Sequence, residues 1–200
     1  MKQTLPKVII NGDFYCNNLT GIERYANEIT KRLDALSAPY EIGIIIPRNG
    51  KNIPLFTNLK TIRYDKDIVS FPKWQQCILP RILKQHKAIP LDFGNACSLF
   101  RPGISFLHDI YAELYPQDFT TKREIFERFY FRLMYRIIAK RARRICTVSQ
   151  FSKDQIIQRL GVKSEKITVI YSSHLHFKTI QADYSVFDEH RELSQPYYFS

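Results

Sequence analysis

His108 and Asp109 stand directly after a short apolar run, in the segment ISFLHDIYAELYP at residues 104–116. A histidine at the end of a buried strand can donate a hydrogen bond or carry a proton near neutral pH, and an adjacent aspartate can orient a neighbouring group. A satisfied structural pair, with the aspartate capping the next segment, has the same two residue types at the same spacing. Taken alone, the pair favours this structural interpretation.

A second group of candidates lies where a loop at residues 12–21 leads into an amphipathic stretch. The first residues of a helix have free backbone N–H groups that can receive an anion. The local sequence TGIERY is not a Gly-x-Gly-x-x-Gly fingerprint, because Glu23 stands where another glycine would allow close approach. Gly21 is therefore either a hinge between loop and helix or a ligand contact, and a nicotinamide cofactor is not supported.

The segment TVSQFSKDQIIQRLG at residues 147–161 contains a third group of candidates. Ser152 followed by Gln155 fits a capping box, and Gly161 fits the stop at the end of the helix. Ser149 ends the preceding apolar run, where it either faces a ligand or begins the cap. Helix structure explains most of this segment.

Basic residues concentrate in the segment KREIFERFYFRLMYRIIAKRARR at residues 122–144. At every fourth position they form a cationic stripe that winds slowly around a helix: Arg128, Arg132, Arg136, Lys140 and Arg144. The apolar residues expected on the opposing face are Phe126, Phe129, Tyr130, Leu133 and Ile137.

Two interpretations of this helix stay open. The stripe is either the solvated outer face of a helix packed on the core, or a contact with anionic lipid. The lipid contact is favoured by the near absence of acidic residues after Glu127 and by aromatic residues expected at the surface. Nucleic acid is a weaker alternative, because no recognised binding motif accompanies the charge.

The bulk composition fits one globular domain better than two. The chain has 200 residues, of which 44% are hydrophobic, and 30 Lys and Arg residues against 19 Asp and Glu residues leave a net charge of +11. Such a surplus indicates an anionic partner. The sequence has no uncharged apolar window of about 18–20 residues and no small-residue cleavage site near the N-terminus, so we expect neither a membrane span nor an export signal.

Cysteine and histidine usage indicates a reducing compartment and argues against a metal centre. The four cysteines include no Cys-x-x-Cys pair, and Cys146 lies inside the apolar run RICTVS, as a small buried side chain would. We therefore expect reduced thiols in a cytoplasmic protein. His174 and His176 have no cysteine or carboxylate cluster beside them, so we expect no metal site and no metal cofactor.

Strand-like and helix-like segments alternate along the chain, which predicts an α/β fold with a Rossmann-like parallel sheet and helices on both faces. The expected strands occupy residues 7–11, 41–47, 60–64, 88–95, 103–109, 144–149 and 166–172. The expected helices occupy residues 21–36, 71–86, 119–142 and 152–160. Pro80 should break the second helix and Pro90 should interrupt the fourth strand. The apolar face of the first helix should consist of Ile22, Tyr25, Ala26, Ile29, Leu33 and Leu36.

The chain changes character near residue 174. The stretch from there to residue 196 is polar and weakly patterned, and the ending PYYFS resumes an aromatic strand signature. We therefore expect a Rossmann-like domain over residues 1–174, a linker over 175–196 and the start of a second domain at 197–200.

Three of these segments, taken in order, resemble the N-terminal half of GT-B glycosyltransferases, in particular the large family 4 of retaining enzymes. TGIERYANEI is similar to that family's loop and first helix, FLHDIYAELYP to its histidine-aspartate segment, and ICTVSQFSKDQIIQRLGVKSEKITVIYSS to its N-terminal signature. The resemblance covers nearly the whole chain. It implies an enzyme in which two Rossmann-like domains face each other across a cleft.

The resemblance also implies roles for the candidate residues. In the family, the N-terminal domain chiefly holds the acceptor, and the histidine that matches His108 lies near the donor sugar, so His108 is the candidate catalytic residue. The transition state has oxocarbenium character, so hydrogen bonds and positive charge near the leaving phosphate matter more than a nucleophile. The candidate substrate-binding residues are Gly21, Ile22, Arg24, Tyr25, Asp109 and Ser149.

The donor-binding half of the family carries two glutamates eight positions apart, and no glutamate in this chain has another eight residues later. The resemblance thus implies an acceptor-side domain, inactive alone, of an enzyme that uses a nucleotide-sugar co-substrate. We expect a glycan or lipid-linked acceptor in cell-surface polysaccharide synthesis, and a peripheral position at the inner face of the membrane with the cationic stripe toward the lipid.

The alternative is a non-catalytic or degenerate domain that binds anionic lipid or a partner protein through the basic helix. A nucleotide-dependent epimerase or dehydrogenase is disfavoured by the absent glycine fingerprint.

Overall fold

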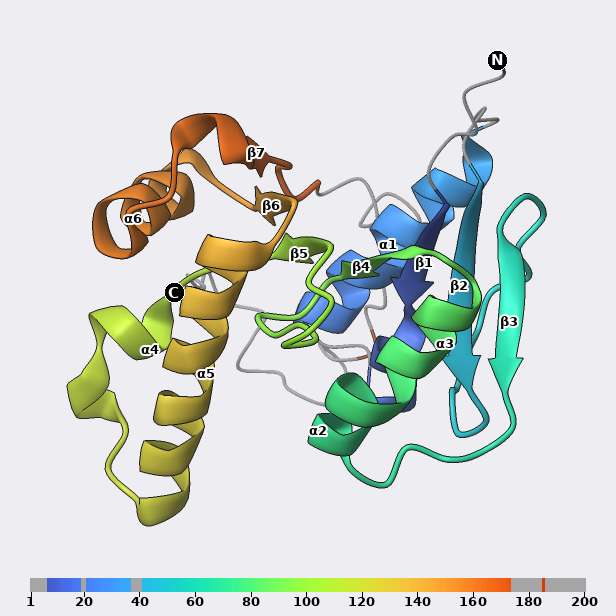
Figure 1. Ribbon diagram of the computed structural model, residues 1–200, viewed down its shortest axis with the longest axis horizontal. Helices are drawn as coiled ribbons and strands as arrows, with labels where there is room; N and C mark the ends of the chain where they lie inside the picture. The colour runs from blue at the N-terminus through green and yellow to red at the C-terminus, as the bar shows by residue number, and fades with distance from the viewer. Residues whose placement is uncertain (1–6, 19–20, 37–40, 174–184, 186–200) are drawn as a thin grey trace.

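Seven parallel strands form one sheet in the computed structural model, which describes residues 7–18, 21–36, 41–173 and 185. The strand order is β3-β2-β1-β4-β5-β6-β7 (Figure 1). The strands are β1 (Val8–Asn11), β2 (Ile42–Pro47), β3 (Lys60–Tyr64), β4 (Ile89–Asp92), β5 (Ile104–Phe106), β6 (Arg144–Thr147) and β7 (Ile167–Val169). Every neighbouring pair is parallel, so the predicted Rossmann-like α/β fold is confirmed.

Helices connect the strands and cover both faces of the sheet (Figure 1). The α-helices are α1 (Gly21–Ala35), α2 (Phe71–Lys73), α3 (Leu79–Gln85), α4 (Tyr111–Leu114), α5 (Lys122–Arg141) and α6 (Gln150–Leu160). A π-helix, η2 (Trp74–Ile78), joins α2 to α3, and short 3-10 helices occupy η1 (Gly12–Cys16), η3 (Pro116–Asp118) and η4 (Ser164–Lys166).

The two faces of the central strands contribute to separate parts of the core. Successive side chains of a strand point to opposite faces, so Ile10 packs in the cluster that receives α1, whereas Ile9 packs with Trp74 and the leucines of α3. A third cluster joins α5 and α6 to β6 and β7. All three clusters lie along one continuous sheet, which gives a rigid frame to the loops at its edges.

The two prolines have milder effects than predicted. Pro80 is the second residue of α3, and instead of a break the chain passes through η2, in which the N–H of Leu79 donates to the carbonyl of Trp74. Pro90 lies within β4 without interrupting it, so that prediction is wrong. The N–H of Ile89 donates to the carbonyl of Lys7, just before β1. Successive N–H groups of a strand point to opposite neighbours, so the nitrogen of Pro90, which has no hydrogen, points toward β5. The pairing of β4 with β5 begins only at the next residue, Leu91.

The first helix is one residue shorter than predicted. It ends at Ala35, so Leu36 lies beyond the apolar face assigned to it and is exposed. Asn27 is buried instead, because its side-chain oxygen accepts a 2.9 Å hydrogen bond from the hydroxyl of Tyr15. The predicted members that pack on the core are Tyr25, Ala26, Ile29 and Leu33.

The long helix α5 begins at Lys122 rather than at residue 119, because Thr121 and Glu124 form a capping box at its start. The apolar face assigned to α5 is wrong for three of its five members, because Phe126, Phe129 and Leu133 are exposed. Its aromatic residues Phe126 and Phe129 thus lie at the surface, as expected. Ile137 packs against the core and Tyr130 is half-buried. The residues that α5 buries are Met134, Tyr135, Ile138 and Ala139.

The linker and second-domain boundaries predicted for residues 175–200 lie outside the described residues, apart from Ser185. Within the part of the chain that the structure describes, no helix combines the length and apolar character needed to cross a bilayer.

Candidate functional site

The ends of four strands bring most of the candidate residues to one edge of the sheet. β1 ends at Asn11 and β4 at Asp92, while His108 follows β5 and Ser149 follows β6. Ile22, in the first turn of α1, lines the same cavity as Asn11 and Asp92. In parallel α/β sheets, ligands bind at this carboxyl edge, where strands lead into loops and helices.

His108 is buried and held by the loop that follows β4. Its backbone N–H donates a 2.8 Å hydrogen bond to Asn95 Oδ1, and its Nε2 lies 2.7 Å from the carbonyl oxygen of Phe93. A carbonyl only accepts, so Nε2 carries a hydrogen, and in the neutral ring Nδ1 is an acceptor. Burial lowers the pKa of His108, outweighing the opposing effect of the Phe93 carbonyl. The imidazole is therefore a neutral group fixed at the carboxyl edge of the sheet.

Asp109 is exposed and points along the chain rather than toward His108. Its Oδ1 accepts a 2.9 Å hydrogen bond from the N–H of Tyr111, the first residue of α4. The structural part of the prediction for this pair, an aspartate that caps the next segment, is confirmed. Its contact with substrate stays a prediction.

The residues predicted around the start of α1 divide between two cavities. Gly21, Arg24 and Tyr25 line a cavity of about 290 Å³ between α1 and the segment that follows β7. The hydroxyl of Tyr25 donates a 2.8 Å hydrogen bond to the carbonyl of Ile170, which joins the helix to that segment. A Cβ on Gly21 would have no atom within 4 Å, so packing does not demand glycine there. Ile22 faces the second cavity instead.

The second cavity, of about 340 Å³, contains polar residues that the sequence analysis missed. Asn11 Nδ2 donates hydrogen bonds of 3.0 Å to Asp13 Oδ2 and to Asp92 Oδ1, and its own Oδ1 accepts a 2.9 Å hydrogen bond from Trp74 Nε1. Oδ2 of Asp92 is buried, and no hydrogen bond reaches it from the described residues. Aromatic walls face these groups: Phe14, Phe71, Phe93, Tyr130 and Phe131.

Both carboxyl groups of this cavity hold their protons more strongly than usual. Burial raises the pKa of Asp13 to about 7, with a further increase from the charge of Asp92. Burial also raises the pKa of Asp92 to about 6. Near neutral pH the pair can therefore hold one proton between them, so it can both donate and accept hydrogen bonds. A signal for Asp92 was present in the sequence, since a carboxylate stands inside the apolar run IPLDF.

Ser149 caps α6. Its Oγ accepts a 3.0 Å hydrogen bond from the N–H of Ser152, so the alternative in which Ser149 begins the cap is confirmed. The capping box predicted at Ser152 and Gln155 is wrong by three residues. The stop predicted at Gly161 is confirmed, because that residue ends α6 in the left-handed conformation with φ of 65°. Ligand binding by Ser149 stays a prediction, and its hydroxyl is already engaged in the cap.

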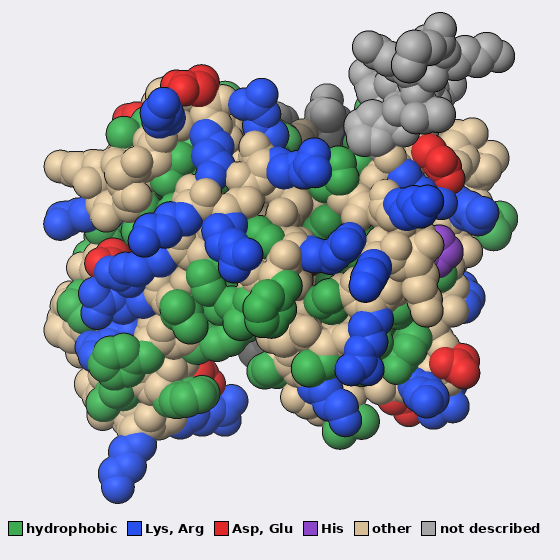
Figure 2. Space-filling view, in the orientation of Figure 1, with side chains coloured by type: hydrophobic (Ala, Val, Ile, Leu, Met, Phe, Trp, Pro, Cys, Tyr) green, Lys and Arg blue, Asp and Glu red, His purple; other side chains and the backbone are tan. Residues whose placement is uncertain are grey.

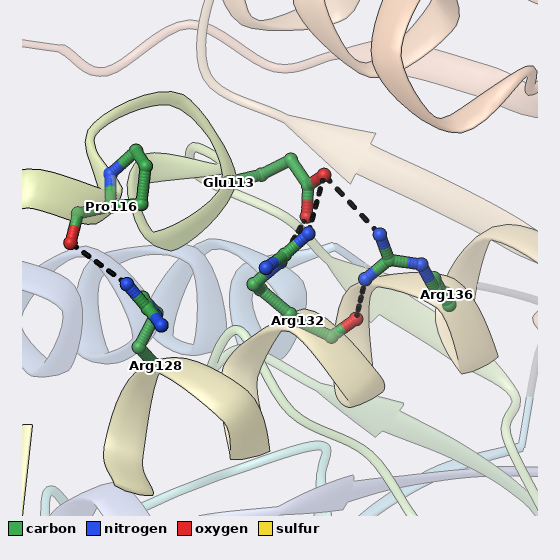
Figure 3. Close-up of polar contacts among 5 residues, drawn as sticks. All are labelled: Glu113, Pro116, Arg128, Arg132 and Arg136. Carbon is green, nitrogen blue, oxygen red and sulfur yellow. Dashed lines mark hydrogen bonds and ion pairs between the residues drawn. The ribbon is translucent and has the colours of Figure 1, made fainter. Parts of the chain in front are cut away.

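Three members of the cationic stripe on α5 are engaged by neighbouring elements (Figure 3). Glu113 of α4 accepts from Arg132 Nε at 2.8 Å and from Arg136 Nη2 at 3.2 Å. Arg128 donates to the carbonyl of Pro116 at 3.0 Å. The last member, Arg144, lies in β6 rather than in the helix and donates to the carbonyl of Glu165. The stripe therefore has a structural role, whatever else it contacts.

The four cysteines are separate thiols, and Cys146 is buried as predicted. Among the described residues, no three His, Cys, Asp or Glu side chains come together as metal ligands. His174 and His176 lie outside the described residues.

Comparison with known proteins identifies a family for most of the chain. The sequence model described as Glycosyltransferase Family 4 matches residues 19–173. That range covers α1, the His108 segment and the strand-helix unit that contains Ser149.

A curated protein is similar over a shorter stretch. The O-antigen chain mannosyltransferase RfbU of Salmonella typhimurium (strain LT2) is 40% identical over 67 residues, which are 34% of this chain. The match spans only 17% of the length of that relative.

Proposed function

Since this chain belongs to glycosyltransferase family 4, we propose that it forms the acceptor-side half of a retaining enzyme that moves a sugar from a nucleotide-sugar donor to a glycan or lipid-linked acceptor. We further propose that the product is a cell-surface polysaccharide. The relative that is named for transfer of mannose to the O-antigen chain supports this assignment.

The observation that carries the proposal is the cavity at the carboxyl ends of β1 and β4. Sugars present hydroxyl groups at their edges and apolar C–H groups on their faces. Two carboxyl groups that hold one proton between them match the hydroxyl groups, and aromatic walls match the apolar faces. Asp92 Oδ2 accepts no hydrogen bond of ordinary geometry from the described residues, although the side chain of Gln75 lies close enough to lower the pKa of Asp92, and we propose that a sugar hydroxyl donates to this oxygen.

His108 is proposed to act from the adjoining strand end. As a neutral ring held through Nε2, it offers Nδ1 to a hydroxyl of the donor sugar or the acceptor. A hydrogen bond of this kind stabilises an oxocarbenium-like transition state without forming a covalent bond to the sugar. Gly21, Arg24 and Tyr25 are proposed to contact substrate from α1, where the free N–H groups of the first turn also favour an anion.

We propose no metal cofactor, with the nucleotide sugar as co-substrate, and a cytoplasmic protein that associates peripherally with the inner face of the membrane. The acceptor, if lipid-linked, lies in that membrane.

The test separates acceptor binding from donor binding on the chain of 200 residues. We expect a glycan array to detect binding of oligosaccharides, and calorimetry to detect little binding of UDP-sugars or GDP-sugars. Asp92→Asn should weaken oligosaccharide binding about tenfold, because a charged acceptor is lost. Strong binding of a nucleotide sugar, together with no glycan binding, would contradict the assignment of this chain to the acceptor side.

A further inference from the structure

A basic hollow lies at the amino edge of the sheet, opposite the candidate site. It has a volume of about 430 Å³ and is lined by Arg101, Arg141 and Arg143, with Gly103 and Phe100 between them. Arg101 belongs to the connection between β4 and β5, Arg141 ends α5, and Arg143 directly precedes β6. Three arginines from separate segments therefore line one hollow where these strands begin.

Hydrogen bonds to and from the backbone hold the segments that carry these arginines. Arg141 Nη1 donates a 2.8 Å hydrogen bond to the carbonyl of Leu99, and the N–H of Arg143 donates at 2.8 Å to the carbonyl of Gly103. The N–H of Arg101 donates at 3.3 Å to Ser98 Oγ. The hollow is thus formed by ordered backbone, so its arginines need little rearrangement to receive a ligand.

A second hollow continues the same basic surface. It is lined by Arg81 and Lys84 of α3 and shares Phe100 and Arg101 with the first. No acidic side chain of the described residues lines either hollow. The view in Figure 2 shows Lys and Arg side chains gathered across this side of the molecule with few acidic groups among them.

The basic residues of this surface differ from two members of the α5 stripe, Arg132 and Arg136, in having no acidic partner among the residues that line the hollows. Arg132 and Arg136 are both paired with Glu113, whereas the two hollows contain five basic residues and no acid of the described chain. Phe100, which lies between the hollows, is 74% exposed. An exposed aromatic ring within an unpaired cationic surface suits the boundary between headgroups and acyl chains of an anionic bilayer.

We propose that this surface binds an anionic lipid bilayer, with a lipid phosphate in the hollow between Arg101, Arg141 and Arg143 and with Phe100 inserted among the headgroups. A guanidinium group binds phosphate oxygens in a forked geometry, and several basic groups add their attraction near a negative surface. A soluble phosphate would use the arginines but would leave Phe100 in water, so the lipid accounts for both features.

Docking through this surface leaves the candidate site, at the opposite edge of the sheet, uncovered by the bilayer. α3 and α5 lie on the same face of the sheet and extend from the amino edge toward the carboxyl edge (Figure 1). If the bilayer contacts this face, the carboxyl edge of the sheet stays exposed to solvent near the membrane surface, where a lipid-linked acceptor can reach it. The inference concerns lipid binding alone and does not depend on sugar transfer.

The experiment is co-sedimentation of the chain with vesicles of phosphatidylglycerol mixed into phosphatidylcholine, and with vesicles of phosphatidylcholine alone. We expect binding only to the anionic vesicles, and a loss of roughly 30-fold in the variant Arg101→Gln/Arg143→Gln, from the removal of two basic groups. Phe100→Ala should weaken binding by about threefold to tenfold without changing the charge.

The matched control is Arg63→Gln/Lys66→Gln, which removes the same charge from exposed positions on β3 and the loop that follows it. We expect this control to bind nearly as well as the unmodified chain. An equal loss in both double variants would show that net charge alone drives binding and would overturn the proposal. So would unchanged binding in the Arg101/Arg143 variant.

Calorimetry with glycerol phosphate separates a lipid from a soluble anion. One outcome is that the unmodified chain binds glycerol phosphate, that Arg101→Gln/Arg143→Gln does not, and that the chain fails to sediment with anionic vesicles. This outcome would assign the hollow to a soluble phosphate compound and reject the lipid. Circular dichroism verifies the fold of each variant. If the double variant does not fold, Arg101→Gln alone tests the same hollow, and vesicle binding equal to that of the unmodified chain rejects the proposal.

Discussion

Asn11 Nδ2 donates a 3.0 Å hydrogen bond to Oδ1 of Asp92, a residue 81 positions later in the chain, and so joins the ends of β1 and β4. The same nitrogen donates to Asp13, so one amide serves two carboxyl groups. Burial raises the pKa of both carboxyl groups by more than their hydrogen bonds lower it, so the folded protein retains a proton here near neutral pH.

The first prediction concerns the pH dependence of stability. The pKa of Asp13 is raised to about 7 and that of Asp92 to about 6, so the stability that their protons confer is complete below about pH 4 and is lost as pH rises through about 6–7. In Asp13→Asn, which keeps an acceptor for Asn11, this loss should shrink by about 1–3 kcal/mol. Urea unfolding at about pH 5 and about pH 8 measures the difference. Parallel pH profiles for the two proteins would contradict the raised pKa of Asp13.

The second prediction separates the structural and chemical roles of His108. His108→Ala leaves the buried carbonyl of Phe93 without its donor and should lower the free energy of unfolding by about 1–3 kcal/mol. His108→Gln keeps an amide N–H for this carbonyl and should recover most of that stability.

Sugar transfer should nevertheless fall in both variants, by about 10²-fold, because neither supplies the imidazole Nδ1 acceptor. The assay uses an enzyme in which these residues are joined to a donor-binding domain of the family. If His108→Gln restored transfer along with stability, His108 would be a positioning residue for the Phe93 loop rather than a catalytic residue.

The strand-helix alternation was enough to predict the sheet, because buried parallel strands appear as short apolar runs whatever their neighbours are. Local signals also placed Gly161 correctly as a helix stop. The cap of α6 was misplaced because Ser149 and Ser152 are both acceptable caps, and only the direction of the backbone after β6 selects the first. Leu36 was misassigned for a similar reason, since periodicity does not determine the last turn of a helix.

The candidate site was less predictable than the fold, because its contacts are long-range. Asn11 and Asp92 meet only after β1 and β4 pair, and nothing local to either residue indicates the other. The structural role of the α5 stripe could not be predicted either, because its acidic partner Glu113 lies on α4, a short helix that the apolar pattern did not predict.

The third prediction tests Ser149 as a helix cap. Ser149→Ala removes the oxygen that accepts from the N–H of Ser152 and should lower the free energy of unfolding by about 1 kcal/mol. Ser149→Asp supplies a carboxylate at the same position and should keep α6 as stable as in the unmodified chain. Thermal or urea unfolding compares the three proteins. A normal stability of Ser149→Ala would mean that the cap contributes little, and would favour the predicted substrate contact as the reason for a serine here.

The fourth prediction concerns the close approach of the chain to Pro90. A Cβ on Gly103 would lie 2.2 Å from the carbonyl oxygen of Pro90 and 2.7 Å from its Cδ, so Gly103→Ala must displace backbone. We expect a loss of about 2–3 kcal/mol in the free energy of unfolding. Gly94→Ala is the control, because a Cβ there has no atom within 4 Å and the residue does not have positive φ. An equally mild effect at both glycines would show that β4 and β5 can separate at little cost.

The fifth prediction concerns Glu113, which is 16% exposed and accepts from Arg132 and Arg136 (Figure 3). Burial acts to raise the pKa of Glu113, but the hydrogen bonds and charges of the two arginines outweigh it and lower the pKa overall. The ion pairs therefore stabilise the fold above the pKa of the unfolded chain, and this stabilisation is lost as pH falls through the lower folded value. Glu113→Gln should lower the free energy of unfolding at neutral pH by about 1–2 kcal/mol.

Glu127→Gln is the matched control, because it removes the acid of an ion pair on the same helix. Glu127 pairs with Arg123 at 2.9 Å, but the arginine is 88% exposed, and such surface pairs between residues four apart contribute only about 0.3–0.5 kcal/mol. The two variants lose the same charge, so a difference between them measures what the fold gains by burying Glu113 between α4 and α5. If urea unfolding gave equal losses of free energy for Glu113→Gln and Glu127→Gln, the ion pairs of Arg132 and Arg136 would be no stronger than an ordinary surface pair. Pairing with Glu113 would then no longer distinguish these two arginines from the arginines of the basic hollow.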